Sequence, residues 1–150
     1  MPPTTRSRVP DNTNESVNED IQRQIEERVR YYAGHPGKIP RRLRELDQEW
    51  DIERAIEANA AVVGFGGVFL GAAVDRRWLA LPALVTGFLF QHALQGWCPP
   101  VPILRRLGFR TAHEIELERN ALKALRGDYR DVESASDKAG AALESARQAA

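Results

Sequence analysis

The chain has a single cysteine, Cys98, among its 150 residues. One cysteine excludes an internal disulfide framework and any metal site built from cysteines alone. The chain also lacks an excess of either charge, because 21 basic residues balance 21 acidic ones. Balanced charge gives no whole-chain attraction to nucleic acid, so we expect no nucleic-acid partner.

Charge is almost absent from the middle of the chain. Between Arg54 and Arg105 the charged residues are Glu57 and the tripeptide 75–77, whereas both flanks are rich in Arg and Glu. The mean hydropathy of −0.44 conceals this segregation. Residues 1–10 contain no apolar run, so we expect no cleavable secretory signal, and membrane insertion would depend on the central segments.

The middle contains two apolar segments. The first is the uncharged run Ala60–Val74, which has 15 residues and four glycines. This is short of the roughly 20 residues that a membrane span needs, so a buried helix of a soluble protein remains an alternative. The second runs from Trp78 to Trp97 without a formal charge. In one helix these tryptophans would lie about 28 Å apart, close to the thickness of the hydrocarbon layer, where tryptophans favour the interfaces.

The tripeptide 75–77 between the segments is long enough only for a tight turn, so the two helices must be antiparallel. We therefore predict an all-α fold in which residues 55–112 form a two-helix transmembrane hairpin and its exit segment, flanked by cytoplasmic amphipathic helices. Basic residues concentrate on the flanks, which favours a multi-pass protein of the cytoplasmic (inner) membrane with both termini cytoplasmic. The flanking basic residues are Lys38, Arg41, Arg42, Arg44, Arg54, Arg105, Arg106, Arg110, Arg119 and Lys123.

Outside the hairpin the patterns are polar or amphipathic. Residues 1–15 have little to bury and are predicted to be a disordered tail. Residues 16–54 and 113–130 show helical spacing of apolar residues, and residues 131–150 form a low-complexity tail. The narrow stripe of Leu43, Leu46 and Trp50 leaves two interpretations open, a helix on the membrane surface or one packed against a neighbouring helix. The proline-rich stretch after Cys98 is expected to leave the bilayer without a helix.

Small residues line one face of each apolar segment. Such faces let helices approach closely in lipid, either within the hairpin or between subunits of a homo-oligomer. The residues concerned are Ala60, Gly64, Gly67 and Gly71 in the first segment and Ala83 and Gly87 in the second.

Antiparallel pairing around the loop predicts a polar cluster near the cytoplasmic end of the hairpin. Two interpretations remain open: polar groups at this depth serve a function, or they form hydrogen bonds between the helices. The cluster comprises Glu57, Asn59, Gln91, His92 and Gln95, with Cys98 just beyond.

The pair Cys98 and His92 suggests three roles for the thiol. An imidazole can activate a neighbouring thiol or ligate a metal beside it, and a cysteine can also be an inert small residue. One Cys and one His supply only two ligands, so we expect no metal and no cofactor.

The chain resembles the YgaP-like transmembrane domain family, a bacterial inner-membrane domain of unknown function. The resemblance rests on Asn59, on two short apolar segments, and on Gly96-Trp97-Cys98-Pro99 followed by Leu107-Gly108 and Thr111. It covers about residues 55–112. Some family members are fused to a rhodanese, which implies a sulfur-transfer partner and a Cys98 that receives or passes sulfur.

Three functions follow from these patterns. The first is a non-enzymatic membrane protein with a structural or assembly role and self-association, because no catalytic motif occurs. The second is a thiol-based sulfur acceptor or redox relay that uses Cys98 at the cytoplasmic membrane face. The third is a soluble helical interaction protein.

Overall fold

A computed structural model of the chain describes residues 4–130, 132 and 135–149, and the described residues form helices without a strand. The predicted all-α class is confirmed. The chain folds as two compact units. We call Met1–Ile21 with Trp50–His113 the hairpin unit and Gln22–Glu49 with Glu114–Ala150 the helical unit. Each unit has its own apolar core.

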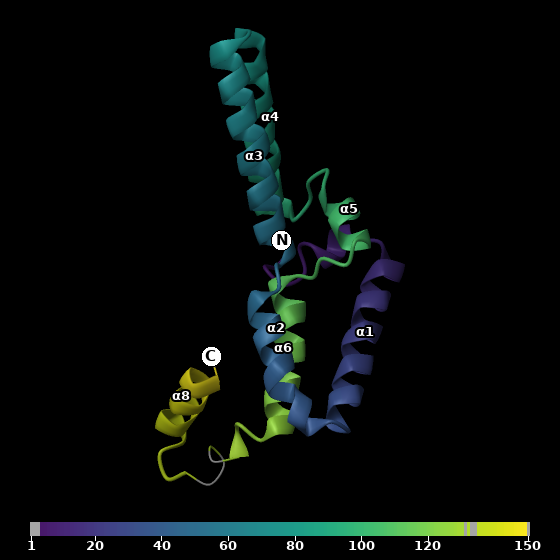
Figure 1. Ribbon diagram of the computed structural model, residues 1–150, viewed down its shortest axis with the longest axis vertical. Helices are drawn as coiled ribbons and strands as arrows, with labels where there is room; N and C mark the ends of the chain where they lie inside the picture. The colour runs from purple at the N-terminus through teal and green to yellow at the C-terminus, as the bar shows by residue number, and fades with distance from the viewer. Residues whose placement is uncertain (1–3, 131, 133–134, 150) are drawn as a thin grey trace. The chain divides into compact units, whose positions relative to one another are not determined.

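Two antiparallel helices joined by a short turn form the centre of the hairpin unit (Figure 1). Acidic side chains cap the starts of the first helix and of the turn, as expected where backbone N–H groups are free. The Asp51 carboxylate accepts a hydrogen bond from the N–H of Arg54 at 2.7 Å, and Asp75 accepts one from the N–H of Arg77 at 2.8 Å. The elements are α3 (Ile52–Ala73), the 3-10 turn η3 (Arg76–Leu79) and α4 (Ala80–Gln95).

The two helices of the hairpin differ in length. Among the described residues one helical stretch, which ends at Ala73 and contains α3, is long and apolar enough to cross a membrane. The 22 residues of α3 extend about 33 Å, whereas the 16 residues of α4 extend about 24 Å. A single helix from Trp78 to Trp97 was predicted, and this is wrong. Trp78 lies in the 3-10 turn, and Gly96, with a φ of 76°, ends α4 before Trp97.

Large apolar side chains cover the outside of the hairpin. The exposed fractions reach 73% at Val62 and 76% at Phe65, and α4 likewise exposes Leu84, Phe90 and Leu94. Only 22% of the most apolar part of the helical stretch that contains α3 is buried. The hairpin unit thus exposes many large apolar side chains, whereas the core helix of a soluble protein would be mostly buried.

Two glycines allow α3 and the start of α4 to approach closely. A Cβ atom added to Gly67 would lie 2.6 Å from Cδ of Pro82 and 3.1 Å from Cβ of Leu81, and one added to Gly71 would lie 2.5 Å from Leu79. These glycines therefore pack within the hairpin, as one of the two interpretations of the small-residue stripe predicts.

The rest of the stripe does not share this packing. No atom lies within 4 Å of a Cβ built on Gly64 or Gly87, Ala83 is exposed, and Ala60 lines a cavity described below. Only Gly67 and Gly71 of the predicted face pack closely within the hairpin. The residues that they contact lie nearer the turn than Ala83 and Gly87.

Replacing Gly67 by Ala is expected to destabilise the hairpin by about 1–3 kcal/mol, because the proline ring and backbone of Pro82 cannot rotate away. Gly71→Ala should cost less, since its nearest contact is the flexible end of Leu79. Gly64→Ala is the matched control and should be neutral or stabilising, because alanine is the better helix former. Thermal unfolding of the three variants in detergent measures the difference. Equal stability of the Gly67 and Gly64 variants would contradict this packing.

The proline-rich stretch after Cys98 forms a helix, contrary to the sequence prediction. This helix, α5, covers Val101–Arg106, and Pro100 and Pro102 occupy its N-cap and first turn. Proline is compatible with these positions because the first turn of a helix has no acceptor for its N–H groups. The prediction of a non-helical exit treated every proline as a helix breaker.

Residues 4–14 are ordered, whereas a disordered tail was predicted for this segment. It includes a short 3-10 helix, η1 (Pro10–Asn12), and Val9 is buried against Ile52, Ile56 and Val101. Asn12 donates hydrogen bonds to the carbonyl oxygens of Arg8 at 2.8 Å and Gln95 at 2.7 Å. The segment is thus held by one apolar anchor and by a free carbonyl group at the end of α4.

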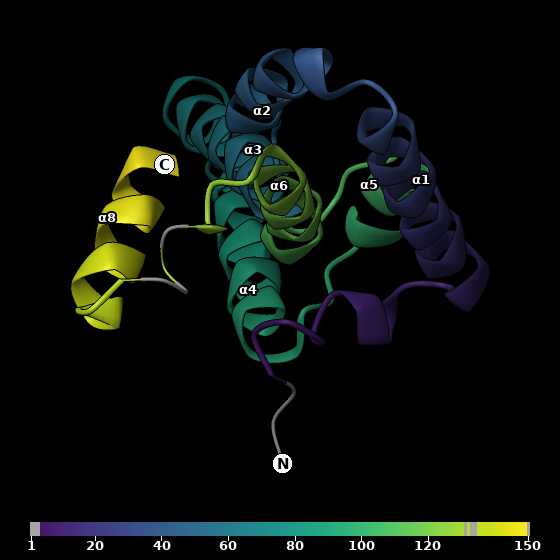
Figure 2. The ribbon, with the colours of Figure 1, turned by 90° about the horizontal axis from the view of Figure 1, so that it is seen from below.

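Helix α1 (Glu15–Ala33) begins in the hairpin unit and continues into the helical unit. The helical unit also contains the 3-10 turn η2 (Pro36–Lys38), α2 (Ile39–Gln48), nearly all of α6 (Ala112–Arg126) and α8 (Lys138–Ala149). In both views α2 and α6 lie side by side (Figures 1 and 2). Leu43 and Leu46 are buried with Ile115 and Leu122, whereas Trp50 is exposed. The apolar stripe of α2 therefore packs against a neighbouring helix. Of the predicted tail, residues 131, 133–134 and 150 lie outside the described residues.

Candidate functional site

Cys98 is buried where the chain turns from α4 into α5. Its side chain is 2% exposed and belongs to the core of the hairpin unit. The left-handed Gly96 ends α4 and reverses the chain, and the N–H of Val101 then donates a hydrogen bond to the carbonyl oxygen of Cys98 at 3.0 Å. Two local turns therefore fix the position of this thiol.

His92 lies between an acid and the thiol. His92 is 4% exposed, and its Nε2 lies 2.6 Å from Oε2 of Glu53. The Cys98 thiol is also close enough to the imidazole to interact with it. Nδ1 is buried and makes no hydrogen bond of standard geometry, so it is the ring nitrogen available to the thiol. A buried polar atom without a hydrogen bond is costly, and such atoms are frequent where chemistry occurs.

Arg8 holds the acid of this set in place. Its Nη2 donates to Oε1 of Glu53 at 2.8 Å, and its Nη1 donates to the carbonyl oxygen of Ala93 at 3.0 Å. Burial alone would raise the pKa of Glu53, but the hydrogen bond and charge of His92 and the charge of Arg8 outweigh it and lower that pKa. Glu53 is therefore a carboxylate at neutral pH, with one oxygen for Arg8 and the other for His92.

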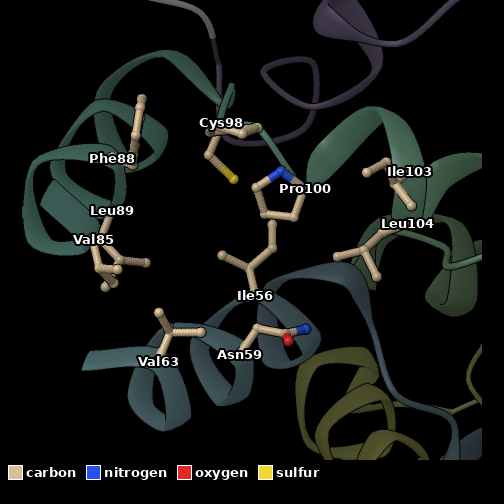
Figure 3. Close-up of a pocket in the computed structure, with 12 residues that line it drawn as sticks. Ile56, Asn59, Val63, Val85, Phe88, Leu89, Cys98, Pro100, Ile103 and Leu104 are labelled. Atoms are coloured by element: carbon tan, nitrogen blue, oxygen red, sulfur yellow. The ribbon is translucent and has the colours of Figure 1, made fainter. Parts of the chain in front are cut away.

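An apolar cavity of about 460 Å³ adjoins the thiol. Figure 3 shows the Cys98 sulfur directed toward its centre, with side chains from α3, α4 and α5 around it. The lining includes no charged residue, and its polar groups are the Asn59 amide and the Cys98 thiol. The lining residues are Ile56, Asn59, Ala60, Val63, Val85, Phe88, Leu89, Cys98, Pro99, Pro100, Ile103 and Leu104.

The order Glu53, His92, Cys98 is the arrangement of an activated nucleophile. A carboxylate that accepts the Nε2–H proton fixes the imidazole tautomer with a lone pair on Nδ1. That lone pair can accept the thiol proton, and the carboxylate stabilises the imidazolium that forms. Because Pro99 and Pro100 have no backbone N–H, the residues that follow Cys98 cannot supply the donors of an oxyanion hole.

The predicted polar cluster takes a different form. Glu57, Asn59 and Gln95 are exposed, Gln91 is half-buried, and Asn59 donates to the Ala55 carbonyl oxygen of its own helix at 3.1 Å. His92 contacts Glu53, one helical turn before Glu57. A 3-10 turn rises more per residue than an α-helix, so counting outward from the loop misplaced the register.

The structure brings His92 together with Cys98, as the sequence suggested, and adds Glu53 and Arg8, which sequence reasoning missed. Glu53 had a weak signal, since it is an acidic residue within one turn of the predicted span. Arg8 had none, because its segment was predicted to be disordered.

No family model, curated protein or solved structure matches this chain. Among the described residues there is also no group of three or more His, Cys, Asp or Glu side chains that could hold a metal ion. The likeness to the YgaP-like transmembrane domain family therefore remains a prediction, and the site must be interpreted from its own geometry.

Proposed function

We propose that this chain is a protein of the bacterial inner membrane in which Cys98 accepts a chemical group at the cytoplasmic face. The observation that carries the proposal is the position of His92, with Nε2 on Glu53 and its other nitrogen available to Cys98. The thiolate attacks the donor, and the imidazolium returns its proton to the leaving group.

The exposed apolar surface of α3 and α4 supports the membrane location. In this proposal the hairpin is inserted in the bilayer, and residues near 56–74 and 78–97 are its membrane-spanning segments. Since α4 extends only about 24 Å, the second crossing would need local thinning of the bilayer or the added length of η3. The basic flanks favour a cytoplasmic location for both termini, and Glu53 and Arg8 would then lie on that side.

A purely structural role with self-association receives less support. The glycines that favoured a subunit interface already have neighbours within the hairpin, since Gly67 packs against Pro82 of α4 and Gly71 against Leu79 of η3. A soluble interaction protein is likewise less favoured, because Val62, Phe65 and Phe69 would all face water.

His92→Gln is expected to slow alkylation of Cys98 at neutral pH by about tenfold or more, because the imidazole no longer removes the thiol proton. Glu53→Gln should also slow the reaction, since an amide donates to Nε2 and reverses the tautomer. Glu57→Gln, an exposed acid one turn later in α3, is the matched control and should behave as wild type. The full chain in detergent is treated with iodoacetamide, and the modified fraction is followed by mass spectrometry.

A change in access to the buried thiol must be separated from a loss of activation. The rates are therefore measured between pH 6 and 9 and divided by those of the same variant in denaturant. Loss of activation gives His92→Gln a steeper dependence on pH than wild type, whereas altered access lowers the rate equally at every pH. Wild type and His92→Gln with equal rates and equal pH profiles would refute the proposed function.

A further inference from the structure

We propose that the group accepted by Cys98 is a long-chain fatty acyl group, held as a thioester with its hydrocarbon chain in the adjoining cavity. This inference rests on the proposed function and adds the substrate class to it. It is carried by three features: the buried thiol directed into the cavity, the charge-free lining, and the unpaired nitrogen of the buried His92 beside the thiol.

The size and chemistry of the cavity fit a hydrocarbon chain. Its volume of about 460 Å³ lies within the usual range of small-molecule sites, roughly 300–1,000 Å³. Most such sites carry several polar groups that orient a polar ligand. Here the lining is supplied by aliphatic, aromatic and proline side chains, and only Asn59 and Cys98 bring polar atoms. Burying methylene groups against such a lining lowers the free energy, whereas a charged ligand would find no charged partner there.

The same lining disfavours sulfur as the accepted group. The outer sulfur of a persulfide on Cys98 would extend beyond His92 into a cavity whose lining has no cation, and a buried negative charge without a partner is costly. A thioester is neutral. The cavity therefore discriminates against the persulfide that the family resemblance suggested and in favour of the acyl group.

The transfer requires an acyl thioester as donor. His92 takes the proton of Cys98, and the thiolate attacks the carbonyl carbon of the donor. The new bond joins the Cys98 sulfur to that carbon, the bond from the carbon to the donor sulfur breaks, and the imidazolium returns its proton to the departing thiolate. One thioester and one thiol enter and one of each leave, so no oxidant or reductant is needed.

Access to the cavity is from the side of the hairpin. Val63 on α3 is 40% exposed and Ile103 on α5 is 62% exposed, and both belong to the lining. Part of the cavity wall therefore reaches the surface among the same apolar side chains that the proposed function places in lipid. A chain can enter from there while the polar part of the donor stays outside.

The test uses the purified full chain in detergent, incubated separately with palmitoyl-coenzyme A and acetyl-coenzyme A. Intact mass spectrometry is expected to show the mass of one palmitoyl group, which neutral hydroxylamine removes and which Cys98→Ser does not acquire. Because the cavity binds the chain, palmitoyl transfer should exceed acetyl transfer by about a hundredfold or more. Transfer at equal rates would overturn the inference.

A pair of neighbouring substitutions tests the cavity itself. Val63→Phe fills the lining, whereas Val62→Phe adds the same ring to an exposed position outside it. Val63→Phe should lower palmitoyl transfer by about tenfold or more, since a ring now competes with the chain for space. Val62→Phe should leave it unchanged. Equal transfer in the two variants would overturn the inference.

Iodoacetamide separates the two proposals. If alkylation depends on His92 while palmitoyl transfer shows no preference for chain length, the acyl inference is wrong and the activated thiol stands. If alkylation does not depend on His92, the proposed function itself is wrong, whatever the acyl transfer shows.

Discussion

Replacing Glu118 by Ala is expected to destabilise the helical unit by about 3–5 kcal/mol, because it leaves two arginines without their shared carboxylate. Glu118 is 0% exposed. Its Oε2 accepts from Nε of Arg28 at 3.1 Å, and its Oε1 accepts from Nε of Arg42 at 2.8 Å. The carboxylate therefore joins α1 and α2 to α6. Removing it costs far more than a surface ion pair would, since the remaining charges stay partly buried.

The pKa of Arg42 reflects the same contact. Burial disfavours the charged guanidinium, but the hydrogen bond and charge of Glu118, together with Glu45 and Glu49, outweigh it and raise the pKa of Arg42. Arg42 therefore remains charged across the neutral range, and its share of the loss in Glu118→Ala should not depend on pH between about 6 and 9.

Glu116→Ala is the matched control for this prediction. Glu116 lies two residues earlier in α6 and pairs with Arg119, but its side chain is 47% exposed. Pairs of this kind contribute about 0–1 kcal/mol. Urea unfolding of both variants, followed by circular dichroism, measures the difference. If Glu118→Ala lost no more stability than Glu116→Ala, the buried carboxylate would not be what holds α1, α2 and α6 together.

The helices of this chain were predictable where local signals agreed. Apolar residues at helical spacing predicted helices within residues 16–54, and α1 covers Glu15–Ala33. The helix begins one residue before the predicted range, where the Asn14 side chain accepts the N–H of Ser16 at 3.0 Å. Helix boundaries depend on competition between neighbouring capping residues, which apolar spacing alone does not resolve.

The candidate site depended on contacts between distant residues, and these were less predictable. Cys98 and His92 are six positions apart, so a helix end followed by a turn brings them together. Glu53 is 39 positions from His92 and Arg8 is 45 positions from Glu53. No spacing rule joins them, because the register of the hairpin and the path of the amino-terminal segment are set by packing. The buried Val9 shows how one apolar residue can order a segment of disorder-like composition.

The amino-terminal segment that supplies Arg8 passes directly over the end of α4. Gly96 has a φ of 76°, and a Cβ atom added there would lie 2.2 Å from the carbonyl oxygen and 2.4 Å from the carbonyl carbon of Arg8. Backbone atoms cannot rotate away as a flexible side chain can. Gly96 is therefore needed both for the left-handed end of α4 and for the approach of Arg8 to Glu53.

Gly96→Ala is expected to destabilise the hairpin unit by about 2–5 kcal/mol, of which about 1–2 come from the left-handed backbone and the rest from the contact with Arg8. Gly108→Ala is the matched control, because Gly108 has a φ of 90° and nothing within 4 Å of an added Cβ. Thermal unfolding in detergent measures both variants, and trypsin cleavage after Arg8 reports the position of the segment. In Gly96→Ala the displaced segment should be cleaved faster, and alkylation of Cys98 should slow because Glu53 loses its arginine. Equal stability and equal cleavage in the two variants would show that Arg8 is not held against the end of α4.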